Sequence, residues 1–185
     1  MKALQRSYLI LRSFSSKNVW ALIQTFKTFV RPILEYGSVI WSPRYSRDIN
    51  AIEQVQRYFT RKTFRRCGIP YRSYPDRLHK LGMRSLEYRR REFDIIMLYK
   101  IIHKHVDVPF HNYFDFYSTP YCTRRHKFCL KNDKCKTNHE RSFFSKRIIT
   151  TWNKLPHHIV ECDTIKSFSQ KLKKFDLATI CNLSF

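Results

Sequence analysis

The stretch SRDINAIEQVQRYFTRKTFRRCG, residues 46–68, predicts a long amphipathic helix, whereas the apolar run FDIIMLYKII (93–102) predicts the central buried helix. At 100° per residue, the apolar side chains of the amphipathic helix fall on one arc and three arginines fall on the opposite side. The apolar arc consists of Ile49, Ile52, Val55, Phe59 and Thr63. The opposite side carries Arg57, Arg61 and Arg65, which we call the arginine ridge. Ser46 opens this helix, and Gly68 follows its end, as expected for a glycine C-cap.

The arginine ridge has two possible interpretations. Most charged stripes on helices are simply solvated faces. Here only Glu53 offers an acidic partner four residues away, so three like charges repel one another with little salt-bridge support. A surface that contacts phosphate groups would relieve that repulsion, and both interpretations stay open at this point.

Capping residues, prolines and glycines predict further helices on both sides of this stretch. They are expected over residues 2–12, from Ser15 or Ser16 to a break at Arg31–Pro32, over 33–41, over 75–81, from Ser85 to about Lys104, from Thr137 or Asn138 to Asn153, and from Asp163 or Thr164 to Phe175. Within the helix that ends at Asn153, the side chains expected to face inward are Phe143, Phe144, Ile148, Thr151 and Trp152. At least one of Arg89, Arg90 and Arg91 is expected to be a solvated or snorkelling side chain, because successive helical residues point about 100° apart.

The predicted fold class is therefore mainly α. Residues 1–105 are expected to form a helical bundle, residues 106–137 a basic linker rich in loops and turns, and residues 138–185 a tail with two C-terminal helices. This linker is expected either to be the least ordered segment or to form a β-ribbon around Lys127–Leu130. The three glycines are too few for a fold rich in hairpins.

The charge of the chain points to a polyanionic partner. Lys and Arg number 36 against 14 Asp and Glu, a formal net charge of +22, and the basic residues are spread among apolar ones along the chain. Nucleic acid is favoured over an anionic membrane or an acidic protein, because arginines and aromatic residues alternate around Tyr58, Tyr71 and Tyr74. The candidate nucleic-acid-binding residues are Arg57, Arg61, Arg65, Arg124, Arg125, Lys127, Lys173 and Lys174.

No catalytic motif is present in the sequence. The eight Asp and six Glu are isolated, so no pair of carboxylates is placed to hold two metal ions, and no catalytic residue or cofactor is assigned. The cysteines are scattered, and Cys122, Cys129 and Cys135, with His126 and His139, lack a C-x2-C knuckle, so no zinc site is predicted. No apolar run approaches the roughly 18–20 residues of a membrane span, and no signal peptide is recognised. An intracellular location, nuclear or cytoplasmic, is expected instead of secretion.

Several blocks together carry a resemblance to a known family. In order they are FKTFVRPILEYGSVIWSP (26–43), DINAIEQVQRYFTRK (48–62), HKLGMRSLEYRRREFDIIMLYKIIH (79–103), RSFFSKRIITTWNKLPHHIV (141–160) and SFSQKLKKF (167–175). Their order and spacing resemble the C-terminal region of the reverse transcriptases of non-LTR retrotransposons, the jockey-like LINE elements and their relatives. The resemblance covers about residues 2–176.

The resemblance implies an RNA-directed DNA polymerase whose palm, with its paired aspartates and divalent metals, lies upstream of this region. This chain would then supply a helical thumb and tail that hold an RNA/DNA primer–template duplex, and it would be inactive alone. Tyr8, Leu9 and Trp20 are expected to lie on a surface that would meet the palm, which predicts marginal solubility without nucleic acid. Two alternatives remain: a stand-alone nucleic-acid-binding protein, and a structural or interaction module whose charge only keeps it soluble.

Overall fold

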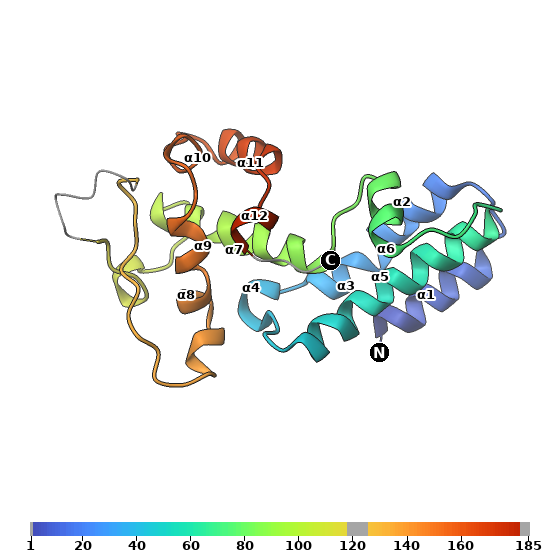
Figure 1. The fold of residues 1–185 in the computed structure, drawn as a ribbon, viewed down its shortest axis with the longest axis horizontal. Coiled ribbons are helices and arrows are strands. Elements are labelled where there is room, and N and C mark those ends of the chain that lie inside the picture. The colour runs from blue at the N-terminus through green and yellow to red at the C-terminus, as the bar shows by residue number, and fades with distance from the viewer. Residues whose placement is uncertain (1, 118–125, 182–185) are drawn as a thin grey trace. The chain divides into compact units, whose positions relative to one another are not determined.

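The computed structural model describes residues 2–117 and 126–181, and within these the chain is mainly helical (Figure 1). Helices account for 64% of the described residues, which contain no strand, so the predicted mainly α class is confirmed. The chain divides into two compact units, unit 1 up to Arg89 and unit 2 from Arg90 onward. The boundary falls inside one helix, and the three-part division expected from the sequence stays a prediction.

Unit 1 is a bundle of helices with a long central member. Its helices are α1 (Lys2–Ser13), α2 (Val19–Phe29), α3 (Arg31–Glu35), α4 (Ser38–Trp41), α5 (Ser46–Arg66) and α6 (Tyr74–Lys80). α1 and α5 lie side by side, and α2 packs against both (Figure 1). The breaks after α2 and α3 fall where the chain carries Pro32 and then Gly37, whose φ of +63° is readily adopted only by glycine.

The inward face of α5 agrees with the predicted apolar arc. Val55, Phe59 and Thr63 are buried, and the ring of Phe59 lies 4.8 Å from that of Phe26 on α2. Phe64 is also buried in this core. Burial of such side chains supplies about 1.5–3 kcal/mol each, so this face holds the bundle together.

Helix ends in unit 1 follow local sequence signals. After α5, Gly68 has a φ of +66°, its N–H donates to the Arg65 carbonyl, and the Ile69 N–H donates to the Phe64 carbonyl at 3.0 Å. This is the Schellman motif, and the same pattern at Gly82 ends α6. The start of α2 differs from the expectation.

Asn18, and neither Ser15 nor Ser16, caps α2 by accepting a hydrogen bond from the Ala21 N–H at 3.1 Å. Ser16 instead accepts a hydrogen bond from the Asn18 N–H. The expected cap is therefore wrong by two to three residues. Asparagine caps as well as serine does, so the local signal was ambiguous.

Glu53 of α5 joins three helices of unit 1. Its side chain is only 4% exposed, and its carboxylate accepts the Leu86 N–H at 3.0 Å, at the start of α7 (Leu86–Ile102). It also accepts a short hydrogen bond from the Tyr74 hydroxyl of α6. A carboxylate is favoured at this position because a helix N-terminus presents unpaired N–H groups and a partial positive charge. Ser85 completes the cap, as predicted, by accepting the Tyr88 N–H.

The three successive arginines of α7 have different surroundings. Arg89 forms a forked ion pair with Glu35, with Nη2 and Oε2 3.0 Å apart. Arg90 is 1% exposed, and Arg91 is half-buried. Arg89 and Arg91 are partly exposed and Arg90 is buried, which agrees with the expectation that at least one of the three has a solvated or snorkelling side chain.

Unit 2 is built from the rest of α7 and several short helices. These are η1 (Phe110–Asn112), η2 (Glu140–Ser142), α8 (Phe144–Arg147), α9 (Ile149–Asn153), α10 (His157–Val160), α11 (Ile165–Lys174) and α12 (Ala178–Cys181). Thr164 caps α11 as predicted, and Phe168 and Leu172 on its apolar stripe are buried. Two further short helices, α10 and α12, were not predicted.

The helix expected up to Asn153 is broken into three pieces. Thr137 accepts the Glu140 N–H ahead of the single turn of η2, whose N-cap residue is His139, so neither Thr137 nor Asn138 caps a long helix. Phe143 then has extended backbone angles, φ −61° and ψ 144°, and its side chain is 51% exposed. The expectation that Phe143 faces inward is therefore wrong, whereas Ile148, Thr151 and Trp152 are buried as expected.

Aromatic rings form the centre of unit 2. The ring of Tyr99 stacks on Phe168 at 4.0 Å and on His103 at 4.2 Å, and its hydroxyl donates to the Cys162 carbonyl. Trp152 is fully buried beside Phe168. This arrangement connects α7, α9 and α11.

Residues 126–130 are fastened to α9, although they lie in the stretch expected to be a linker. Trp152 Nε1 donates to the Phe128 carbonyl at 2.9 Å, and the Asn153 side chain both donates to and accepts from the backbone of Leu130. Leu130 also pairs with Phe116 in an isolated antiparallel bridge, and the expected β-ribbon around Lys127–Leu130 does not form within the described residues.

A buried ion pair links α7 to α8. The Arg147 guanidinium donates to both carboxylate oxygens of Asp94, at 2.8 and 2.9 Å, and also to the Ser142 carbonyl. Asp94 is fully buried. Sequence reasoning did not find this pair, because its members are 53 residues apart.

No helix in the described ranges combines the length and the apolar character needed to span a membrane.

We expect Arg147→Met to destabilise unit 2 by about 3–5 kcal/mol, because it leaves the Asp94 carboxylate buried without its partner. Replacing both residues, with Asp94→Leu added, should recover most of that loss. Urea unfolding followed by Trp152 fluorescence, in a background with Trp20→Phe and Trp41→Phe, measures unit 2 selectively.

The matched control is Asp133→Asn, which breaks exposed ion pairs with Lys131 and Lys146 in the same unit. Its effect should stay within about 0.5 kcal/mol. A similar loss for Asp133→Asn and Arg147→Met would contradict the importance of the buried pair.

Unit 2 should also lose stability as the pH falls below about 6.5. Burial lowers the pKa of His103 and of His126, so the unfolded chain takes up protons at these positions before the folded chain does. The urea midpoint reported by Trp152 should therefore fall between pH 7.5 and about 5.5, and His103→Phe should reduce that dependence. A midpoint equally pH-dependent in His103→Phe would refute the role of His103.

Candidate nucleic-acid interface

The arginine ridge lies beside the loop that follows α5, and the two together border a pair of adjoining hollows in unit 1. Arg61 and Arg65 are exposed, and Arg57 is half-buried. Arg57 and Arg61 line a hollow of about 180 Å³, and Arg61 and Arg65 line one of about 350 Å³. Arg61, Tyr71 and Arg77 border both hollows. The structure therefore brings together the three ridge residues predicted from the sequence and adds Arg72 and Arg77 to them.

Arg77 of α6 positions the loop against α5. Its guanidinium donates to the Arg72 carbonyl at 2.6 Å, to Thr60 Oγ1 at 3.3 Å and to the Arg57 carbonyl at 3.5 Å. Only 5% of the residue is exposed, and this burial lowers the pKa of its guanidinium. Three acceptors on two segments fix the side chain, so its charge stays beneath the two hollows.

Tyr74 and Tyr71 have different roles, although the sequence presents them alike. The Tyr74 hydroxyl donates to Glu53 and accepts from Gln56 Nε2 at 2.9 Å, and the guanidinium carbons of Arg57 and Arg77 lie 5.1 and 5.5 Å from its ring centroid. Burial, reinforced by Glu53, raises the pKa of this phenol far above its ordinary value, so it remains a donor. Tyr71, by contrast, is 86% exposed.

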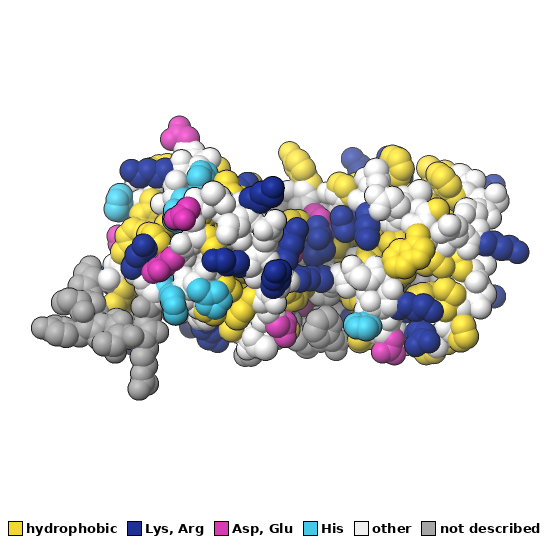
Figure 2. Space-filling view, turned by 90° about the horizontal axis from the view of Figure 1, so that it is seen from above, with side chains coloured by type: hydrophobic (Ala, Val, Ile, Leu, Met, Phe, Trp, Pro, Cys, Tyr) yellow, Lys and Arg dark blue, Asp and Glu magenta, His cyan; other side chains and the backbone are white. Residues whose placement is uncertain are grey.

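The surface around the two hollows carries positive charge and no negative charge among the described residues. Within the described part of the chain, no carboxylate lies within salt-bridge distance of the five arginines that border the hollows, and no acidic residue lines either hollow. In the view of Figure 2, Lys and Arg side chains are scattered among hydrophobic ones and are more numerous than Asp and Glu. Unpaired guanidinium groups around a concave surface favour an anionic ligand with several phosphates.

The other predicted basic residues lie apart from the ridge along the chain. Lys127 is exposed, with Nζ 5.1 Å from the Phe128 ring centroid, and Lys173 and Lys174 are exposed on α11. All three belong to unit 2. Arg124 and Arg125 lie outside the described residues.

A metal site is not formed by the side chains that the structure describes. No group of three or more His, Cys, Asp or Glu residues is close enough to hold an ion within residues 2–117 and 126–181. His126 Nε2 and Cys129 Sγ are 3.9 Å apart, and Nε2 also contacts the Trp152 carbonyl at 3.2 Å. Cys122 lies outside the described residues.

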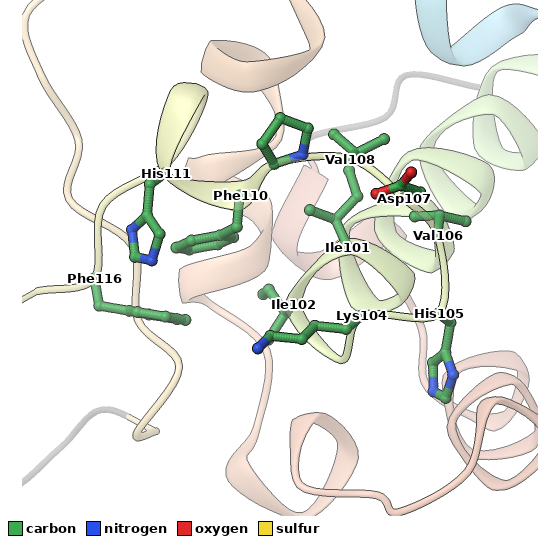
Figure 3. Close-up of a pocket in the computed structure, with 11 residues that line it drawn as sticks. Ile101, Ile102, Lys104, His105, Val106, Asp107, Val108, Phe110, His111 and Phe116 are labelled. Carbon is green, nitrogen blue, oxygen red and sulfur yellow. The ribbon is translucent and has the colours of Figure 1, made fainter.

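Unit 2 contains a larger hollow that sequence reasoning missed. It encloses about 580 Å³ between the end of α7 and the following loop, and apolar side chains such as Ile101, Ile102 and Phe110 line most of it (Figure 3). Phe110 stacks on Phe116 at 4.5 Å. The density of aromatic residues in FHNYFDF (110–116) is the one sequence signal that could have indicated it.

Comparisons with known proteins give little guidance. No family model matches the chain, and no solved structure matches it. A curated Caenorhabditis elegans protein, described as uncharacterized protein B0403.1, is 30% identical over 81 residues, which is 44% of this chain. The chain spans only 41% of the length of that protein.

We expect Arg77→Lys to loosen the loop that carries Tyr71, because an ammonium group cannot reach all three acceptors of the planar guanidinium. The free energy of unfolding should be lower than that of the wild type by about 1–3 kcal/mol. Chymotrypsin should cleave after Tyr71 faster in the variant. Arg72→Lys, which keeps the backbone carbonyl that Arg77 binds, is the control and should leave the cleavage rate near that of the wild type.

Proposed function

We propose that the chain binds duplex nucleic acid through the arginine ridge, as the thumb and tail of a non-LTR retrotransposon reverse transcriptase. Its partner would be an RNA/DNA primer–template duplex. The observation that carries the proposal is the set of arginines that border the two hollows of unit 1 without a carboxylate partner among the described residues. The ordered sequence blocks that resemble this family support the assignment.

The spacing of the ridge suits a nucleic-acid backbone. From Arg57 to Arg65 the α5 helix rises about 12 Å, at about 1.5 Å per residue. One strand of a duplex carries a phosphate about every 3.4 Å along its axis, so this length covers three to four phosphates. Contacts of this kind position a duplex without reading its sequence.

Catalysis is assigned to a palm elsewhere in the polymerase. This chain carries no clustered pair of aspartates in its sequence. The palm, when present with its divalent metals, would supply the chemistry. Tyr8, Leu9 and Trp20 of unit 1 are exposed apolar side chains that such a partner domain would cover.

A stand-alone nucleic-acid-binding protein is the second candidate. It is favoured by the fact that the ridge and both hollows are complete within unit 1. Sequencing the transcript upstream of Met1 separates the two: an in-frame palm with paired aspartates supports the polymerase, whereas a start codon without a palm supports the stand-alone protein.

The triple variant Arg57→Gln, Arg61→Gln and Arg65→Gln should bind duplexes of any sequence more weakly. It should also lower the slope of log K against log salt concentration by about 2–3 units, because each phosphate contact contributes about 0.9. Filter binding over a salt series measures both quantities.

The matched control replaces Arg6, Arg12 and Arg47, which are exposed on α1 and α5 and border neither hollow. It changes the net charge by the same amount but should retain more of the affinity. Equal effects of the two triple variants would show that net charge alone drives binding, and no effect of either would overturn the proposal.

A further inference from the structure

The hollow at the end of α5 has a composition that a duplex backbone does not require. Its apolar part comes from Phe64 and Ile69, and its charged part from Arg61, Arg65 and Arg72. Contact with phosphates along a duplex needs only a charged ridge. An open apolar floor beside that ridge fits a ligand that has both an apolar face and a phosphate.

Tyr71 stands at the border of this hollow with its ring uncovered. It is 86% exposed, although the backbone on either side is held in place. The Schellman motif at Gly68 fixes one end of the loop, and the Ser73 cap of α6 fixes the other. In between, the Arg72 carbonyl accepts the 2.6 Å hydrogen bond from Arg77. The ring is therefore presented on a fixed support and is available for stacking.

We infer that this hollow binds one unpaired nucleotide at the end of a duplex, with its base against Tyr71 and its phosphate at Arg61 and Arg65. Aromatic side chains stack on unpaired bases of any sequence, and arginine holds the adjacent phosphate. The enclosed 350 Å³ is at the small end of the range for ligand sites, which suits one nucleotide better than a base pair.

The hollow is continuous with the arginine ridge. Arg61 and Tyr71 border both this hollow and the smaller one that contains Arg57. A duplex held on the ridge would therefore bring the unpaired nucleotide at its end to Tyr71. The inference rests on the proposed function in this respect, since the ridge delivers the strand.

The test compares a short blunt duplex with the same duplex carrying a single-nucleotide overhang, by fluorescence anisotropy on the full chain. The wild type should bind the overhang about fivefold or more tightly, from one base stacked on an aromatic ring. Overhangs at the 3′ and 5′ ends, of DNA and of RNA, identify the preferred strand end and sugar. An abasic overhang should give no preference.

Tyr71→Ala should abolish the preference for the overhang, and Tyr71→Phe should retain it. Tyr45→Ala, which removes another exposed tyrosine of unit 1, is the matched control and should behave as the wild type does. Equal wild-type affinity for blunt and overhang duplexes, or an undiminished preference in Tyr71→Ala, overturns the inference.

The two proposals fail in different ways. If the wild type binds blunt duplex in a manner that requires the ridge but shows no preference for the overhang, the nucleotide site is wrong and the duplex interface stands. If the wild type binds neither form at low salt, both are wrong.

Discussion

The carboxylate of Glu53 is the interaction on which the arrangement of unit 1 depends. It is buried, and it accepts hydrogen bonds from the first N–H of α7 and from the hydroxyl of Tyr74. The guanidinium groups of Arg57 and Arg77 in turn lie over the ring of Tyr74. One acidic group on α5 thereby fixes the start of α7, the start of α6 and two of the arginines around the hollows. Without it, a buried helix end and a buried phenol would both lack an acceptor.

A large share of the few acidic residues lies in the interior of the protein. Glu53, Glu92 and Asp94 are buried, and Glu35 is largely covered while it pairs with Arg89. Each buried carboxylate is one fewer negative charge on the surface. Arg77 and Arg90 are buried as well, so the buried charges of the two signs largely offset each other and the surface keeps close to the formal net charge of +22, which favours long-range attraction of a polyanion.

The parts of the fold that sequence reasoning predicted are those that local signals specify. The face of α5, the glycine ends at Gly68 and Gly82 and the caps at Ser85 and Thr164 all depend on residues within one or two turns. Such signals act through backbone hydrogen bonds that the same segment makes, so tertiary structure seldom overrides them.

The features that escaped prediction depend on residues far apart in the chain. Asp94 and Arg147, for example, pair across 53 residues of sequence. For the candidate site, the spacing of Arg57, Arg61 and Arg65 indicated the ridge. Nothing near Arg77 in sequence indicated that it would bind Thr60 and the Arg57 carbonyl, which lie 17 and 20 residues before it. A single arginine in a short helix has too many possible partners for its contacts to be inferred from its neighbours.

The fixed loop between α5 and α6 also affects the thermodynamics of any binding there. Ordering one residue's backbone costs about 1–2 kcal/mol of conformational entropy at room temperature. The loop of residues 69–73 has already met that cost during folding, through its bonds at Gly68, Ser73 and Arg77. A ligand that meets Tyr71 therefore loses little of its interaction energy to ordering the protein, and weak contacts to a single base suffice for measurable affinity.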